Sequence, residues 1–136
     1  MHKDNQQEYR QVSGCRLCYY AIKGRIISEM NSVVAIEDCN PVSKKHTLII
    51  PKNHSENYFE LTRQEKQDAD SLISELREKI LADDPSVTGF NIGMNCGESA
   101  GQTIFHAHIH LIPRRDGDTP NPRGGVRGVI PDKMGY

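Results

Sequence analysis

The sequence Phe-His-Ala-His-Ile-His-Leu-Ile-Pro-Arg-Arg, residues 105–115, alternates histidine with apolar residues. Successive side chains of a β-strand point to opposite faces, so His106, His108 and His110 would line one face of a strand. The apolar residues between them would pack into a core, and Pro113 would end the strand because proline cannot donate to a sheet ladder. Imidazole titrates near neutral pH and can act as a nucleophile, an acid, a base or a metal ligand. The stretch therefore predicts a functional site on a rigid strand. The alternative is a histidine run like an affinity tag, but the histidines of a tag are contiguous and have no apolar residues between them.

The composition narrows the class of protein. The chain has 136 residues, a length typical of one domain, and a formal net charge of −1. A near-neutral chain has no general attraction for nucleic acid, and no apolar run is long enough to span a bilayer. We therefore expect neither nucleic acid nor a membrane as partner. The polar N-terminus lacks the apolar core of a signal peptide, so we expect a cytoplasmic protein.

The order of the elements predicts an α+β fold, an antiparallel sheet with one main helix on a face. A short helix or turn is expected at residues 19–23. The predicted strands are residues 25–30, 33–36, 47–50, 88–95 and the histidine stretch.

The main helix has the clearest local signals. Thr62 is a suitable N-cap, and Glu65 three residues later completes a capping box. Apolar residues then recur at spacings of three and four, which is typical of an amphipathic helix. These residues are Ala69, Leu72, Ile73, Leu76 and Ile80. The helix is expected to end near residues 83–85.

The two ends of the chain differ from the middle. We expect a mobile lead-in over residues 1–14, a folded domain over residues 15–115, and an extended tail over residues 116–136. The tail is rich in Gly, Pro and Arg and has no period. A basic arm could cover a polyphosphate chain, or it could be a flexible tail.

Cys15 and Cys18 have a two-residue spacer, which lets both thiolates reach one metal ion. Zinc prefers four tetrahedral ligands, and His54 and His106 are the donors we select, since this choice leaves the other two strand histidines free. The alternatives are a redox Cys-x-x-Cys pair and two unliganded thiols. No thioredoxin-type pattern precedes the pair.

A neutral imidazole can attack phosphorus and form a covalent phosphoryl-histidine, provided that donors stabilise the phosphoryl oxygens. The loop Ala-Gly-Gln-Thr at residues 100–103 could offer such donors, although four small residues are more often a simple turn. His46 and His54 flank one apolar strand. Asp38 and Asn95 follow other predicted strands, and Asp38 could accept from a ribose hydroxyl.

These residues resemble the histidine triad family, whose signature alternates three histidines with apolar residues. Here it reads His-Ala-His-Ile-His-Leu-Ile at residues 106–112. Residues 38–54 and 95–103 are similar to two further blocks of the family. The resemblance implies a homodimer with a five-stranded antiparallel sheet per subunit, which binds purine nucleotides and cleaves at the α-phosphate.

The resemblance also implies roles for individual residues. His108 would be the nucleophile that forms a nucleotidyl-histidine, His110 would bind phosphoryl oxygens or the bridging atom, and His46 would support the triad. The implied substrate contacts are Asp38 for the ribose, and Asn95, Gly101, Gln102 and Thr103, with His108 and His110, for the phosphate. Structural zinc would bind Cys15, Cys18, His54 and His106.

The third histidine is unlike the phosphorylase branch of the family, which carries Gln there. Two branches remain, the nucleoside phosphoramidases and the hydrolases of dinucleoside polyphosphates such as diadenosine tetraphosphate. The tail at residues 123–131 is similar to tails of bacterial members described as polyphosphate hydrolases, which favours the second branch. A nucleotide-binding regulator with negligible turnover is a further alternative.

Overall fold

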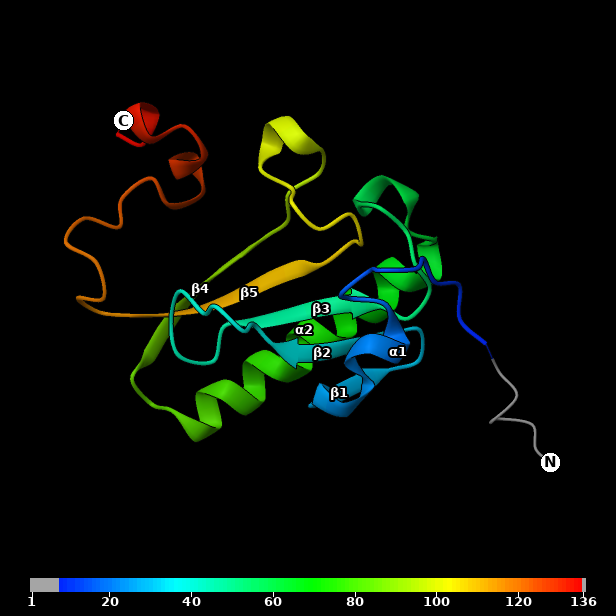
Figure 1. Cartoon of the computed structure of the whole chain (residues 1–136). Coiled ribbons are helices and arrows are strands. Elements are labelled where there is room, and N and C mark those ends of the chain that lie inside the picture. Colours follow the sequence, from blue (N-terminus) through cyan, green and yellow to red (C-terminus); the bar gives the residue numbers. More distant parts are fainter. Residues whose placement is uncertain (1–7, 136) are drawn as a thin grey trace.

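The computed structural model describes residues 8–135, which form one antiparallel sheet with helices on both faces (Figure 1). The strand order is β1-β2-β3-β5-β4. The strands are β1 (Ser28–Met30), β2 (Val33–Glu37), β3 (Thr47–Pro51), β4 (Val87–Gly93) and β5 (Ile109–Arg115). The expected α+β fold with a five-stranded antiparallel sheet is confirmed.

The helix α2 (Arg63–Asp83) covers one face of the sheet. Its capping box is present, because Glu65 N–H donates to the Thr62 hydroxyl (3.0 Å) and Thr62 N–H donates to the Glu65 carboxylate (2.9 Å). The buried positions Leu72, Leu76 and Ile80 pack against inward-facing residues of β2, β3 and β5. No helix among residues 8–135 is both long and apolar enough to cross a membrane.

The opposite face is covered by the N-terminal segment and α1 (Tyr19–Ile22). Leu17 and Ile22 pack there against alternate residues of β2 and β3. The described part of the predicted mobile lead-in is hydrogen-bonded to the domain, and its mobility stays a prediction. Arg10 N–H donates to Asn53 Oδ1 (2.6 Å), and His54 N–H donates to the Arg10 carbonyl (2.8 Å). Residues 1–7 lie outside the described part of the chain.

The histidine stretch differs from the expectation at both ends. The strand β5 begins only at Ile109, so His106 and His108 lie in the segment before it. Pro113 does not end the strand but pairs with Phe90 of β4. The Pro113 carbonyl accepts from the Ser43 hydroxyl (2.6 Å), on the side away from β4. A strand residue directs its nitrogen and its carbonyl to the same side, so proline removes no bond to β4.

Other boundaries shift by a few residues. The predicted strand at 25–30 starts with a 3₁₀ turn, η2 (Lys23–Arg25), and only Ser28–Met30 pair in the sheet. The tail is not simply extended, because it forms the 3₁₀ turns η5 (Gly125–Val129) and η6 (Pro131–Lys133). Two further turns are η3 (Tyr58–Glu60) and η4 (Glu98–Ala100). The division of the chain at residues 15 and 115 stays a prediction.

Candidate functional site

The three triad histidines lie on the sheet face opposite α2. Ala107 and Ile109 line a small hollow against α2, so the histidines that alternate with them point the other way. Ala107 N–H donates to the Ser55 carbonyl (2.7 Å), which holds the segment before β5 in place. The rings of His108 and His110 have centroids 5.3 Å apart.

A chain of hydrogen bonds fixes the protons on His46 and His110. The backbone N–H of Val42 donates to His46 Nδ1 (3.0 Å), so the proton of neutral His46 is on Nε2. His46 Nε2–H then donates to His110 Nδ1 (2.9 Å), which leaves the proton of neutral His110 on its own Nε2. Asp38 Oδ2 lies 3.4 Å from His46 Nε2. His110 can therefore present an N–H to a ligand.

His108 has the opposite tautomer. Its Nδ1–H donates to the carbonyl of His106 (2.7 Å), because a carbonyl can only accept. The lone pair of neutral His108 is then on Nε2. A nucleophilic nitrogen and a proton donor thus occur on neighbouring rings.

Burial favours the neutral form of His46 and of His110. Burial is the main cause that lowers the pKa of His46 and of His110, while the charge of Asp38 acts in the opposite direction on both. The neighbouring His108 and His46 also lower the pKa of His110. At pH 7 the tautomers deduced for His46 and His110 are therefore those of uncharged rings.

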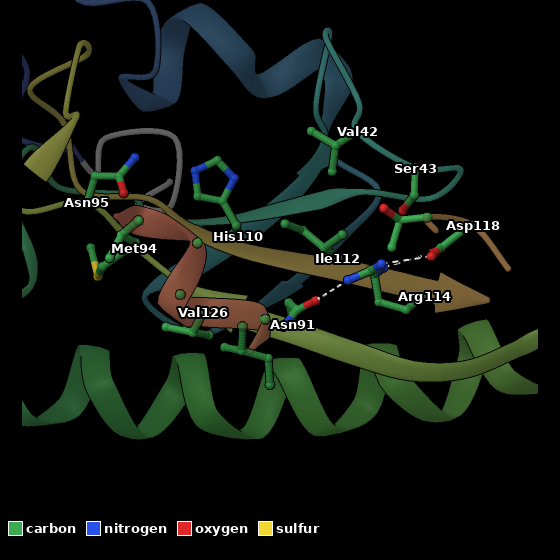
Figure 2. A pocket seen from close by; sticks show the side chains of 16 residues that line it. Val42, Ser43, Asn91, Met94, Asn95, His110, Ile112, Arg114, Asp118 and Val126 are labelled. Carbon is green, nitrogen blue, oxygen red and sulfur yellow. Dashed lines mark hydrogen bonds and ion pairs between the residues drawn. The ribbon is translucent and has the colours of Figure 1, made fainter. Parts of the chain in front are cut away.

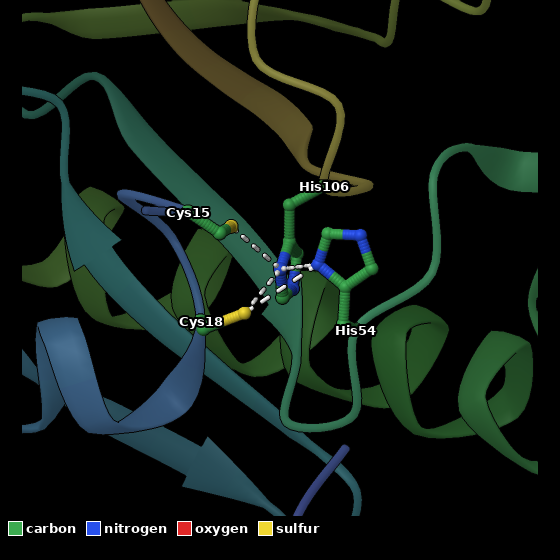
Figure 3. A group of neighbouring side chains, drawn as sticks. All are labelled: Cys15, Cys18, His54 and His106. Carbon is green, nitrogen blue, oxygen red and sulfur yellow. Dashed lines mark hydrogen bonds between the residues drawn. The ribbon is translucent and has the colours of Figure 1, made fainter. Parts of the chain in front are cut away.

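Cys15, Cys18, His54 and His106 meet at one point on the same face (Figure 3). Their donor atoms all lie within 4.8 Å of one another. The Cys15 and Cys18 sulfurs lie 3.5 and 3.6 Å from His106 Nδ1, Cys18 Sγ lies 3.4 Å from His54 Nδ1, and the two Nδ1 atoms are 3.1 Å apart. Tetrahedral zinc with ordinary bond lengths requires about 3.5 Å between S and N and about 3.3 Å between two N atoms.

The chemistry of this donor set also fits a metal ion. His106 Nε2–H donates to the Pro51 carbonyl (3.0 Å), which leaves the lone pair on Nδ1 toward the cluster. Burial lowers the pKa of His106 to about 4, so the ring is the neutral ligand that a metal needs. Burial also raises the pKa of the Cys18 thiol, so a cation is needed to hold this sulfur as a thiolate.

Asp38, His46 and His110 form a second cluster with metal-ligand atoms, but its hydrogen bonds do not suit a metal ion. A metal bound through His46 Nε2 would move the ring proton to Nδ1, where the Val42 N–H already donates. Two N–H groups would then face each other. This cluster is therefore a hydrogen-bonded relay.

The loop at residues 100–103, which is expected to bind phosphate, is held in place by hydrogen bonds of the Gln102 side chain. Gln102 is buried, its amide N–H groups donate to the carbonyls of Glu56 (2.6 Å) and Ile104 (3.1 Å), and its oxygen accepts from Gly97 N–H (2.8 Å). Gly101 has a φ of 95°, which favours glycine. The Gln102 side chain thus has no free donor for a phosphate, and the backbone N–H groups of Gly101 and Gln102 already donate to the carbonyls of Glu98 (2.9 Å) and Gly97 (3.1 Å).

Asn95 and His110 line a cavity of about 580 Å³ on this face (Figure 2). Its other lining is largely apolar and includes Val42, Ile92, Met94, Ile112, Val126 and Val129. Arg114 also lines the cavity, but it is paired with Asp118 (2.7 Å) and donates to Asn91 (2.7 Å). Thr103 instead lines a separate cleft beside Cys15 and His54.

The C-terminal wall of this cavity was not predicted from the sequence. Val126 and Val129 belong to η5, which lies beside β4 (Figure 2). The available signal was weak, because these two apolar residues stand in a stretch rich in Gly, Pro and Arg.

The comparisons with known proteins agree with one another. The HIT domain model matches residues 20–117. An adenosine 5'-monophosphoramidase of Candida albicans is 31% identical over 111 residues, which cover 76% of this chain and 72% of that protein. A HIT family protein of Bacillus anthracis has a crystal structure with 37% identity and a TM-score of 0.68, covering 79% of this chain and 78% of the other.

A zinc-bound histidine triad family protein of Mycobacterium smegmatis is 28% identical, with a TM-score of 0.68 over 79% of this chain and 82% of the other. The match of the domain model covers most of the chain, and the fold is shared with solved members. The chain belongs to the histidine triad family.

Proposed function

We propose that this protein hydrolyses purine nucleotide conjugates at the α-phosphate through a nucleotidyl-His108 intermediate. The observation that carries the proposal is the pair of opposite tautomers on neighbouring rings, with a lone pair on His108 Nε2 and a proton on His110 Nε2. An in-line displacement at phosphorus needs both groups, a nucleophile and a donor for the leaving group.

The two half-reactions balance when solvent supplies and takes the protons. In the first, His108 Nε2 bonds to the α-phosphorus and the bond to the leaving group breaks, while His110 Nε2–H donates a hydrogen bond to the departing atom, which takes a proton from solvent. In the second, water attacks the phosphorus and passes a proton to solvent, and the bond to His108 breaks. The products are the nucleoside monophosphate and the protonated leaving group.

The remaining predicted residues have supporting roles in the proposal. Asp38 lies beside the relay and would accept from the ribose, while Asn95 lines the cavity next to His110 and would contact the phosphate. We keep Gly101, Gln102 and Thr103 as phosphate-loop residues in the proposal, with Gln102 as the residue whose side chain braces the loop.

We also propose that Cys15, Cys18, His54 and His106 hold a structural zinc ion, which would supply a fixed anchor for these four side chains. The distances and the protonation pattern of the four residues support this site. His106 has two tasks in this arrangement, since its ring faces the cluster and its carbonyl holds His108.

The leaving group that we propose is an amine, so the conjugate is a nucleoside phosphoramidate. The cavity beside His110 is largely apolar, and Arg114, which lines it, is already paired with Asp118. A polyphosphate chain would need free cations there. The Candida albicans relative is named as a monophosphoramidase. Dinucleoside polyphosphates, which the tail pattern favours, are the second candidate.

The proposal is tested by measuring turnover of an adenosine phosphoramidate and of diadenosine tetraphosphate with one preparation. We expect faster release of AMP from the phosphoramidate. His108→Ala should reduce turnover of both by about a thousandfold or more while AMP still binds, because it removes the nucleophile. Tight AMP binding without turnover of either conjugate would instead identify a nucleotide-binding regulator.

We propose further that the protein is a cytoplasmic homodimer. The strand β4 is an edge of the sheet, and its Ile92 is exposed together with Val126, Val129 and Ile130 of the C-terminal segment. An exposed edge next to apolar side chains is a surface that proteins usually cover. Light scattering on the full chain should give twice the mass of one chain, and the mass of a single chain would contradict the dimer.

A further inference from the structure

A cleft of about 400 Å³ opens beside the metal cluster and is lined by Cys15 and His54, together with Arg16, Glu56 and Thr103. The two cysteines differ in exposure. Cys15 is half-buried at the cleft, whereas Cys18 is 2% exposed. One sulfur of the cluster can thus be reached by a small solute, and the second lies directly behind it.

We propose that Cys15 and Cys18 form a thiol–disulfide site that reacts with hydroperoxides and releases the metal. The proposal rests on the zinc site proposed above. The sulfurs lie within 4.8 Å of each other, and a two-residue spacer permits a disulfide.

The chemistry proceeds in two steps. Cys15 Sγ attacks one oxygen of hydrogen peroxide, the O–O bond breaks, and a sulfenic acid forms with loss of hydroxide, which takes a proton to become water. Cys18 Sγ then attacks the sulfenic sulfur, the S–S bond forms, and the second oxygen leaves as water after taking a proton. Two thiolates lose two electrons, peroxide gains them, and zinc leaves because two of its four ligands are consumed.

The same site is connected to the proposed nucleophile. His106 belongs to the metal cluster, and its carbonyl accepts from His108 Nδ1 at 2.7 Å. Loss of the metal removes the anchor of the His106 ring and weakens the support that holds the His108 ring. Oxidation at Cys15 and Cys18 should therefore lower turnover without any reaction at the triad.

Two other cysteines must be separated from this effect. Cys39 is exposed, with its sulfur 2.9 Å from the Arg25 guanidinium, and Cys96 is half-buried. Neither belongs to the cluster. The experiment therefore uses the full chain with Cys39→Ser and Cys96→Ser, loaded with zinc.

Hydrogen peroxide is added to this protein, and the released zinc is followed with a coloured chelator. We expect release of about one zinc ion per chain. Arg16 lies between the two cysteines, so trypsin separates residues 11–16 from residues 17–23. Mass spectrometry should find these two peptides joined by a disulfide. Dithiothreitol should separate them and restore zinc binding.

Cys15→His is the matched control, since it keeps four metal-binding side chains but cannot form the disulfide. This variant should keep its zinc under the same peroxide treatment. Equal release from the variant and its parent would overturn the proposal, as would zinc release from the parent without the joined peptides. If the variant binds no zinc, the peptide assay on the parent decides alone.

Turnover is measured as a separate arm. It should fall by about tenfold on oxidation and return with dithiothreitol and zinc, the scale of effect typical when the support of a metal-site residue is lost. Unchanged turnover after full zinc release would refute the connection to His108. Zinc release and the joined peptides are read without substrate, so they test the thiol site even if the chain cleaves neither conjugate.

Discussion

At the scale of single residues, backbone groups decide which nitrogen of each imidazole carries a proton. The Val42 N–H, the His106 carbonyl and the Pro51 carbonyl each contact one nitrogen of a different histidine, His46, His108 and His106. A backbone group has only one role as donor or acceptor, so each contact fixes a tautomer. Similar side chains thereby present different nitrogens, which suit the proposed roles of His46 in the relay, His108 as nucleophile and His106 as metal ligand.

Asp38→Asn should move the acid limb of the pH dependence of kcat to lower pH. The carboxylate of Asp38 favours the protonated rings, so it raises the pKa of His46 and of His110 against the larger effect of burial. Removal of this charge lowers both pKa values further, and the neutral relay then persists into more acidic solution.

The measurement is a pH profile of kcat at saturating substrate, because the variant also lacks the acceptor proposed for the ribose. Zinc content is checked at each pH. Asp70→Asn, at an exposed position of α2, is the control and should leave the profile unchanged. An acid limb that stays in place or moves to higher pH for Asp38→Asn would contradict the electrostatic role.

Gln102→Ala should destabilise the loop between β4 and β5. The amide makes three hydrogen bonds, to backbone groups of the half-buried Gly97 and Ile104 and of the exposed Glu56, and the loss of each such bond costs about 0.5–1.5 kcal/mol. Urea unfolding should show a lower free energy of unfolding, and turnover should also fall because the loop loses its brace. Unchanged stability with a raised KM would instead indicate direct phosphate binding by the side chain.

At the scale of elements, the helix α2 formed where its local signals predict, because its cap and its apolar period lie within the helix itself. The strand β5 did not form over the predicted residues, because the residues at which it begins and ends depend on pairing with β3 and β4. It pairs with β3 only over residues 109–111 and continues beside β4 to Arg115. Pro113 is tolerated because its nitrogen faces the side that β3 no longer occupies.

Thr62→Ala should lower the free energy of unfolding by about 1 kcal/mol, since it removes the side chain that accepts from the Glu65 N–H. Thr62→Ser keeps the hydroxyl and should leave the free energy of unfolding nearly unchanged, because Ser is at least as good an N-cap as Thr. Urea unfolding of both variants makes the comparison. Equal losses for Ala and Ser would show that the hydroxyl does not cap the helix.

At the scale of the whole molecule, the metal cluster joins three distant parts of the chain. Cys15 and Cys18 come from the N-terminal segment, His54 follows β3, and His106 precedes β5. One ion would therefore connect the segment that covers the sheet to the stretch that carries the triad. This connection makes the proposed zinc important for global stability.

Removal of zinc with a strong chelator should lower Tm, and added zinc should restore it, because binding to the folded state adds stability by mass action. Cys18→Ser, which removes the most buried sulfur ligand, should have a low Tm that no longer responds to the chelator. A Tm of the parent that is insensitive to chelation, at confirmed loss of bound metal, would contradict a structural role.

The sequence by itself determined the α+β class, the helix α2 and the chemistry of the histidines, because periodicity, capping and residue type are properties of short stretches. It also predicted, from their donor types, the four side chains that meet in the Cys/His cluster. Only the tertiary structure decided which histidine nitrogen is free, that Gln102 braces its loop, and that η5 forms a wall of the cavity beside His110. These features depend on contacts between residues far apart in the chain. A short stretch of sequence does not indicate which hydrogen bonds its residues will form with distant ones.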